Sequence, residues 1–133
     1  MNLGLEGRVA LVGGASRGLG RAVAEELAAE GAAIAVTARD RDTLAETADA
    51  LGALALPADL SAEGEPTRVV DACAEHFGRL EIVVVNAGGP PGGGFESFGT
   101  DEWRAATALV LTSAVELATA AVPHMRQIGR AHV

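Results

Sequence analysis

The sequence has 133 residues, of which 49% are hydrophobic, and carries a formal net charge of −8 at pH 7. That length suits one domain with one core, and the apolar share argues against an intrinsically disordered chain. The acidic balance disfavours a nucleic-acid partner, because a polynucleotide repels a negative surface.

The basic residues, the single cysteine and the apolar runs limit the chemistry and the location that we expect. All ten Lys and Arg positions are Arg, so the chain contains no Lys, and it contains no Tyr. The single Cys73 lies in a helical pattern and is expected to be buried in the core. No signal peptide and no apolar run of membrane-spanning length is recognised, so we expect a cytoplasmic protein without a membrane partner.

Apolar runs alternate with helical patterns up to residue 85. The runs predict strands at residues 8–12, 33–37, 53–58 and 80–85. The helical patterns predict helices at residues 18–30, 40–51 (with Asp40 as cap) and 61–77 (from Ser61), each followed by a glycine. Strands that are apolar on both faces indicate a buried parallel sheet. The predicted fold class is therefore α/β, a doubly wound parallel sheet of Rossmann type with strand order 3-2-1-4, partial because later strands are missing.

A loop and a long helix follow the last predicted strand. Residues 88–99 are rich in glycine and proline and predict a loop. Thr100 is expected to cap a helix that runs to about Gln127, with Asp101 and Glu102 favourably placed in its first turn.

Three glycines between the first strand and the first helix predict a phosphate-binding turn. Gly14, Gly18 and Gly20 have the spacing G-x-x-x-G-x-G. Such a turn needs glycine for a tight bend, for close approach of the backbone to a pyrophosphate and for close helix–strand contact. The start of the helix then offers free N–H groups to the anion. An ordinary glycine-rich turn is the alternative, and its position after a strand and before a helix disfavours it.

The residues after the second strand indicate which dinucleotide would bind. An acid at the end of this strand would bind the ribose hydroxyls of NAD, but the strand ends in Thr37 and Ala38, followed by Arg39. Arg39 and Arg17 can pair with a 2′-phosphate, so NADP is expected over NAD. The alternative is that both arginines are solvated and that Asp40 and Asp42 neutralise Arg39.

Four motifs in order resemble the short-chain dehydrogenase/reductase family. Residues 13–20 resemble its first motif, although the family usually has Thr where Gly13 stands. Asp59 with Leu60 is similar to its adenine-contacting pair, Asn86-Ala87-Gly88 to its N-A-G motif, and residues 103–125 to its long interface helix. Residues 86–91 resemble the 3-oxoacyl-carrier-protein reductase-like branch. The extended epimerase-like branch usually has the spacing G-x-x-G-x-x-G, which this loop lacks.

The resemblance implies an oxidoreductase that interconverts a ketone and a secondary alcohol by hydride transfer with NADP(H). It also implies that the intact parent forms a homo-oligomer through Thr100–Gln127. The cofactor-binding residues that the motifs assign are Gly14, Ser16, Arg17, Gly18, Leu19, Gly20, Arg39, Asp59, Leu60, Asn86, Ala87 and Gly88.

The catalytic residues of the family are not found in the sequence. The family uses a Ser and a Tyr-x-x-x-Lys motif, whereas this chain has no Tyr or Lys, and Ser113 lies in the helix rather than on the later strand. Val110 stands where the family has a helical Asn. No metal site is expected. We therefore expect the chain as given to lack catalysis, and a non-catalytic NAD(P)-binding regulatory or sensor module remains the alternative.

The chain is expected to consist of two parts. Residues 1–127 are interpreted as a truncated NAD(P)-binding Rossmann domain. Residues 128–133 are interpreted as a foreign tail, because they look like one reading frame of a sequencing adapter; a divergent natural end is the alternative. Truncation would leave residues 80–85 as an unpaired apolar edge with Glu81 as its only charge, and would expose Leu109, Leu111 and Val115.

Overall fold

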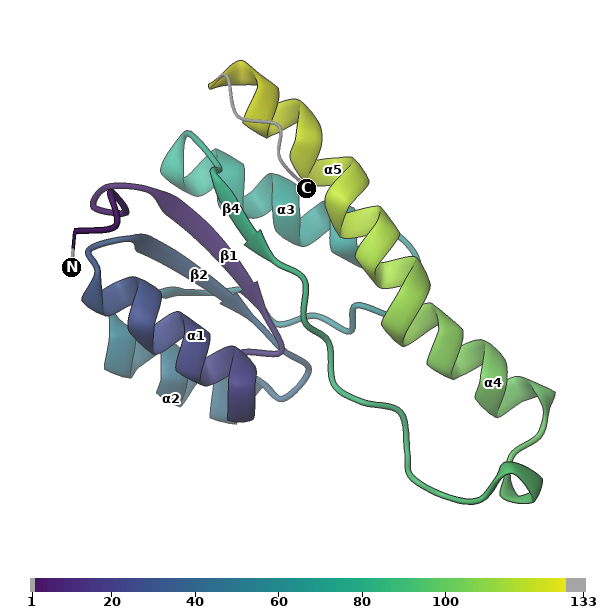
Figure 1. Cartoon of the computed structure of the whole chain (residues 1–133). Helices are drawn as coiled ribbons and strands as arrows, with labels where there is room; N and C mark the ends of the chain where they lie inside the picture. Colours follow the sequence, from purple (N-terminus) through teal and green to yellow (C-terminus); the bar gives the residue numbers. More distant parts are fainter. Residues whose placement is uncertain (1, 129–133) are drawn as a thin grey trace.

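A parallel sheet of four strands is the centre of the computed structural model, which describes residues 2–128 (Figure 1). The strands are β1 (Val9–Gly13), β2 (Ala33–Thr37), β3 (Leu54–Ala55) and β4 (Ile82–Val84), in the order β3-β2-β1-β4. The register pairs Val9 with Ala33 and Ala10 with Ile82. The predicted α/β class and strand order 3-2-1-4 are confirmed.

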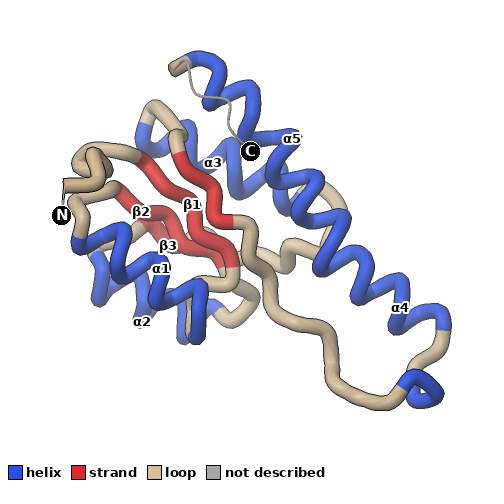
Figure 2. Tube along the Cα trace, viewed as in Figure 1, coloured by secondary structure: helices blue, strands red, loops and turns tan. Residues whose placement is uncertain are grey.

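Helices cover both faces of the sheet, as Figures 1 and 2 show. On one face lie α1 (Gly18–Ala29) and α2 (Arg41–Leu51), and on the other lie α3 (Glu65–Phe77) and α5 (Ser113–Gln127). Side chains alternate along a strand, so β1 contributes Val9 and Leu11 to the α3–α5 core and Ala10 and Val12 to the α1–α2 core. Burial on both faces explains why β1 has no polar residue. It also fixes the carboxyl end of β1 relative to the helices.

The predicted starts of α1 and α2 agree with the structure, whereas the predicted start of α3 does not. Asp40 caps α2, since its Oδ1 accepts hydrogen bonds from the amides of Asp42 and Thr43, both at 3.0 Å. The start of α3 at Ser61 is wrong, because the Asp59 carboxylate accepts hydrogen bonds from both the Ser61 amide and its hydroxyl. These bonds form a turn, and α3 begins only at Glu65.

The outer strands are shorter than the sequence predicts. β3 has two residues instead of residues 53–58, although the amides of Leu56 and Ala58 still donate to the carbonyls of Val36 and Ala38. Pro57 stands between them, where its nitrogen faces away from β2, as is usual for a proline in an edge strand. The chain therefore still follows β2 to its carboxyl end, where Ala58 and Leu60 are buried.

The long helix is continuous in direction but not uniform. It consists of α4 (Thr100–Thr107), the π-helical segment η2 (Ala108–Thr112) and α5. Gly99, not Thr100, is the N-cap residue, and its amide donates to Glu102 Oε2 at 3.0 Å. A π-helical segment adds a residue to one turn and often lies near functional sites, and nothing in the sequence pattern predicts it here.

The same helix corrects the expectation that no apolar stretch reaches membrane-spanning length. Thr100–Gln127 has 28 residues and a window of mean hydropathy 1.7, so by length and composition alone it could cross a membrane. In the structure Leu117, Ala121 and Met125 are buried in the same core as α3. Only 17% of the most apolar window is buried, so most of this face has no covering element within residues 2–128.

The sequence predicts Glu81 as the only charge on the free edge of the sheet, but its side chain does not lie on that edge. This side chain is fully buried, accepts a hydrogen bond from the Val9 amide at 2.8 Å and pairs with Arg79. Its charge therefore holds the start of β1 instead of protecting the edge. Among the described residues β4 pairs with β1 only, and Val85, which follows it, is exposed. In the long helix Leu111 and Val115 are exposed, whereas Leu109 is half-buried. Residues 129–133, most of the proposed tail, lie outside the described residues.

This edge predicts self-association of the 133-residue chain. Val85 is 47% exposed beside β4, so Val85→Lys should lower the average mass in sedimentation towards the 13.4 kDa monomer, because a charged residue opposes strand pairing. Leu3→Lys is the matched control, since Leu3 is 54% exposed at the opposite end of the sheet. A monodisperse monomer for the unaltered chain would contradict this prediction.

Candidate functional site

The turn between β1 and α1 has a shape that only glycine permits. Gly14 and Gly18 have φ values of 57° and 61°, in the left-handed region. A Cβ atom at Gly20 would stand 2.2 Å from the Gly14 carbonyl oxygen, so the first turn of α1 packs directly on the turn. The N-cap residue Arg17 makes no side-chain cap hydrogen bond, which leaves the first amides of α1 without a side-chain acceptor.

The end of β4 closes against this turn. Asn86 donates a hydrogen bond from Nδ2 to the Gly13 carbonyl oxygen at 3.2 Å. A Cβ atom at Gly13 would stand 2.3 Å from the Asn86 carbonyl oxygen, and one at Gly14 would stand 2.7 Å from Asn86 Nδ2. This close approach gives a physical reason for glycine at position 13, where the sequence motif usually has Thr.

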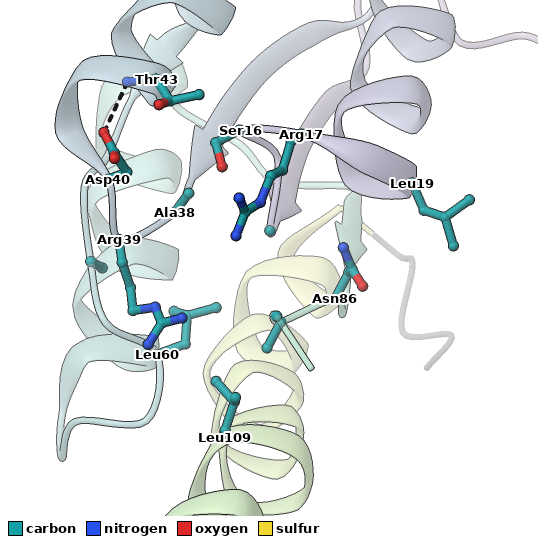
Figure 3. A pocket seen from close by; sticks show the side chains of 14 residues that line it. Ser16, Arg17, Leu19, Ala38, Arg39, Asp40, Thr43, Leu60, Asn86 and Leu109 are labelled. Carbon is teal, nitrogen blue, oxygen red and sulfur yellow. Dashed lines mark hydrogen bonds between the residues drawn. The ribbon is translucent and has the colours of Figure 1, made fainter. Parts of the chain in front are cut away.

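A cavity of about 370 Å³ opens at the carboxyl ends of β1, β2 and β4 (Figure 3). Cavities at this end of a parallel sheet are the usual ligand sites of open α/β folds. The predicted site residues that line it are Gly14, Ser16, Arg17, Leu19, Arg39, Leu60, Asn86, Ala87 and Gly88. The structure thus brings together residues from four separate parts of the chain.

Three predicted site residues do not line the cavity. Gly18 and Gly20 shape the turn and the start of α1 behind it. The Asp59 carboxylate is turned to Ser61, whose hydroxyl and amide donate to Oδ1 at 2.6 and 2.9 Å. These hydrogen bonds lower the pKa of Asp59, and the nearby charge of Arg39 adds to the effect. Contact of Asp59 with a ligand remains a prediction.

Five further residues of the cavity wall are not among the predicted site residues, namely Ala38, Asp40, Thr43, Ala58 and Leu109. Ala38, Asp40 and Thr43 follow the end of β2, so their position beside Arg39 was a usable signal. Leu109 comes from η2, and only the return of the long helix over the sheet places it there. No local pattern marks it.

The charges of the cavity wall are two arginines and one aspartate. Figure 3 shows Arg17 and Arg39 reaching into the cavity from different turns. Neither arginine forms an ion pair within residues 2–128, which disfavours the alternative that Asp40 and Asp42 neutralise Arg39. Hydrogen bonds from the Thr43 and Asp42 amides lower the pKa of Asp40, with a smaller contribution from Arg17. Asp40 is therefore charged at neutral pH.

Two histidines outside the cavity have structural partners. His124 contacts Asp71 Oδ1 at 2.9 Å and so links α5 to α3, and His76 packs edge-on against Phe77. Cys73 is buried as predicted, and burial raises the pKa of its thiol to about 12. Val110 is exposed beside a small pocket that Asn86 and Ser113 also line. No cluster of His, Cys, Asp or Glu in the described part of the chain could hold a metal ion.

Comparisons with known proteins agree with this geometry. The family model described as short chain dehydrogenase matches residues 8–133. The rhamnolipids biosynthesis 3-oxoacyl-[acyl-carrier-protein] reductase of Pseudomonas aeruginosa is 38% identical over 131 residues, which cover 96% of this chain and 51% of that protein. The chain thus spans about half the length of such relatives.

Two solved structures have the same fold over nearly the whole chain. The L-sorbose reductase of Gluconobacter frateurii, complexed with NADPH and L-sorbose, superposes with a TM-score of 0.89 at 35% identity, covering 97% of this chain and 51% of that one. An NADH-dependent reductase complexed with NAD superposes with a TM-score of 0.87 at 27% identity, covering 96% and 56%. Similar folds therefore accommodate either dinucleotide.

The contact at Gly20 predicts a large effect of one methyl group. Gly20→Ala should lower the free energy of unfolding by about 1–3 kcal/mol, because the added Cβ overlaps backbone oxygens that cannot move independently. Gly89→Ala is the control, since a Cβ there meets nothing within 4 Å, and it should change stability by less than about 0.5 kcal/mol. Urea unfolding followed by circular dichroism measures both. Equal midpoints for the two variants would show that α1 does not pack on the turn as described.

Proposed function

This chain belongs to the short-chain dehydrogenase family, and we propose that its cavity binds NADP(H) as the cofactor of an oxidoreductase. The observation that carries the proposal is the arrangement of Arg17 and Arg39, which lack ion-pair partners within residues 2–128, around the glycine turn and the start of α1. The site suits a ligand that carries a pyrophosphate and one additional phosphate.

Each part of the proposed ligand has a matching part of the cavity. The pyrophosphate would lie against the turn at Gly14, where no side chain blocks the backbone and the first amides of α1 lack side-chain acceptors. Leu60, Ala87 and Leu109 supply an apolar surface for a base. Arg17 and Arg39 would hold the 2′-phosphate by charge-assisted hydrogen bonds.

The charge of the wall favours NADP over NAD. Similar folds bind either dinucleotide, so the fold by itself does not decide between them. In this chain the acid that would follow β2 directly is replaced by Ala38 and Arg39. The two arginines would raise the binding affinity of a nucleotide that carries a 2′-phosphate. They would raise the affinity for NAD less, because NAD offers them only uncharged ribose hydroxyls.

The proposed reaction of the intact protein interconverts a ketone and a secondary alcohol. NADPH held by the glycine turn, Arg17 and Arg39 would supply the hydride for the carbonyl carbon of the ketone. The oxygen must then receive a proton, which requires an acid at the site. The 133 residues contain no Tyr and no Lys, so we propose that the described residues hold the cofactor and that this acid is supplied elsewhere in the intact protein.

The long helix offers a surface for contact with a second copy of the protein. The exposed apolar side of Thr100–Gln127, with Leu111 and Val115 both more than half exposed, is suited to contact with a second copy in a homo-oligomer. We propose a cytoplasmic oxidoreductase that acts on a small-molecule substrate.

The assignment of Arg39 predicts a change in nucleotide preference. Arg39→Ala should weaken NADPH binding by about ten- to a hundredfold, which corresponds to the loss of one charge-assisted hydrogen bond, and should change NADH binding little. Arg41→Ala is the matched control, because Arg41 is exposed in the first turn of α2 and does not line the cavity. NADPH and NADH fluorescence titrations give the dissociation constants. An unchanged NADPH-to-NADH ratio in Arg39→Ala would refute the role of Arg39.

The absence of Tyr and Lys predicts that the purified 133-residue chain does not turn over. NADPH oxidation in the presence of a ketone, followed at the nicotinamide absorbance band, should equal that of the Gly20→Ala variant. A rate clearly above this control would contradict the prediction, since it would require a proton donor among the residues present.

A further inference from the structure

A second groove lies between the loop that follows β4 and the start of α4. Its volume is about 450 Å³, and its wall comes from residues within 90–98 and 102–106, none of which lines the cavity at the glycine turn. Figure 1 shows this loop leaving the sheet and returning to α4 through the short 3₁₀ turn η1 (Phe95–Ser97). The groove is therefore separate from the proposed cofactor site.

Three aromatic rings give the groove its apolar surface. The rings of Phe95 and Trp103 have centroids 6.2 Å apart and planes inclined by 53°. Phe95 is 81% exposed and Trp103 is 52% exposed, so no element of the described residues covers this pair. The Phe98 ring lies against Gly93, where a Cβ atom would stand 2.7 Å from Phe98 Cζ. Glycine at position 93 thus lets the loop close over the third ring.

The loop that carries these rings is held by hydrogen bonds. The Ser97 amide donates to the Gly94 carbonyl oxygen at 2.9 Å, which closes η1, and the Trp103 amide donates to the Gly99 carbonyl oxygen at 3.2 Å. The Gly99 amide in turn donates to Glu102 Oε2 at 3.0 Å. The Glu102 carboxylate is thus fixed at the start of α4, where it shares the groove wall with Trp103.

The charge of the groove is negative. Glu102 is the one charged residue among the described residues that line it. Arg104 does not line the groove and instead approaches Asp101 at 3.8 Å. The start of α4 carries about half a positive charge, which one full carboxylate exceeds. The faces of aromatic rings are also electron-rich, so both features of the wall attract a cation.

We propose that this groove is a binding site for a small organic cation with apolar substituents, such as a quaternary ammonium. The methyl groups of such a cation pack against Phe95 and Trp103, and its charge interacts with their ring faces and with Glu102. A quaternary nitrogen has no N–H to donate, so it needs no acceptor beyond the carboxylate that Gly99 already binds. The inference does not depend on the proposed function, because the two sites share no residue.

The fluorescence of Trp103 reports on this groove directly, because the chain contains one Trp and no Tyr. The purified 133-residue chain is titrated with choline chloride and, separately, with 3,3-dimethylbutanol, which has the same shape with a neutral carbon in place of the charged nitrogen. Choline should bind about five- to thirtyfold more tightly, the range expected for a cation–π contact at a partly exposed site. N-acetyltryptophanamide, titrated in parallel, corrects for quenching without binding.

Two variants separate the contribution of a ring from that of the charge. Phe95→Leu keeps an apolar side chain without a ring, and it should weaken choline binding about three- to tenfold while it changes binding of the alcohol by less than about twofold. Glu102→Gln keeps an acceptor for the Gly99 amide and should weaken choline binding about two- to fivefold at low ionic strength, with a smaller effect at about 0.5 M salt. Asp101→Asn is the matched control, because Asp101 is an exposed acid one residue earlier that does not line the groove, and it should change either affinity by less than about twofold.

Several results would overturn the inference. Absence of choline binding, or equal affinity for choline and the alcohol, would show a groove without selectivity for a cation. Equal losses in Glu102→Gln and Asp101→Asn would show a general surface effect, and a choline affinity that falls as the protein concentration rises would show that a second copy of the chain occupies the groove. If Phe95→Leu alters the melting curve in circular dichroism, Glu102→Gln decides the test. Failure of NADPH to bind would overturn the proposed function and leave this inference standing.

Discussion

The close approach of bare backbone at the carboxyl end of β1 is the constraint on which the rest of the site depends. Gly13, Gly14 and Gly20 each have backbone or amide atoms within 3 Å of the position that a Cβ would occupy. Because no side chain intervenes, α1 starts directly above the turn and Asn86 binds the Gly13 carbonyl from β4. The cavity is the space that this packing leaves beside the turn.

Charge then gives the cavity its chemical character. The chain as a whole is acidic, with a net charge of −8, yet two arginines enter this cavity. Their local excess over Asp40 can attract a phosphorylated ligand within a short distance while the remaining surface repels polyanions.

The sequence predicts the strand order, the glycine turn and most of the cavity wall, because these depend on local patterns that hydrophobic periodicity and glycine spacing reveal. The β2 strand is predicted to the residue, since its apolar run is bounded on both sides. The start of α3 is not, because the side-chain bonds between Asp59 and Ser61 compete with helix formation. Burial of Glu81, the π-helical segment and the position of Leu109 depend on contacts between distant segments, which no local pattern encodes.

Hydrogen–deuterium exchange of the 133-residue chain, with and without saturating NADP, tests the central claim most directly. The account predicts that NADP slows exchange in peptides that cover residues 13–20, 38–43 and 86–88, since these segments meet at one cavity and would be held together by one ligand. Peptides from the carboxyl-terminal turns of α5, which do not line this cavity, should change little. Protection confined to segments outside the cavity, or no protection at a saturating concentration, would contradict the assignment of this cavity as the cofactor site.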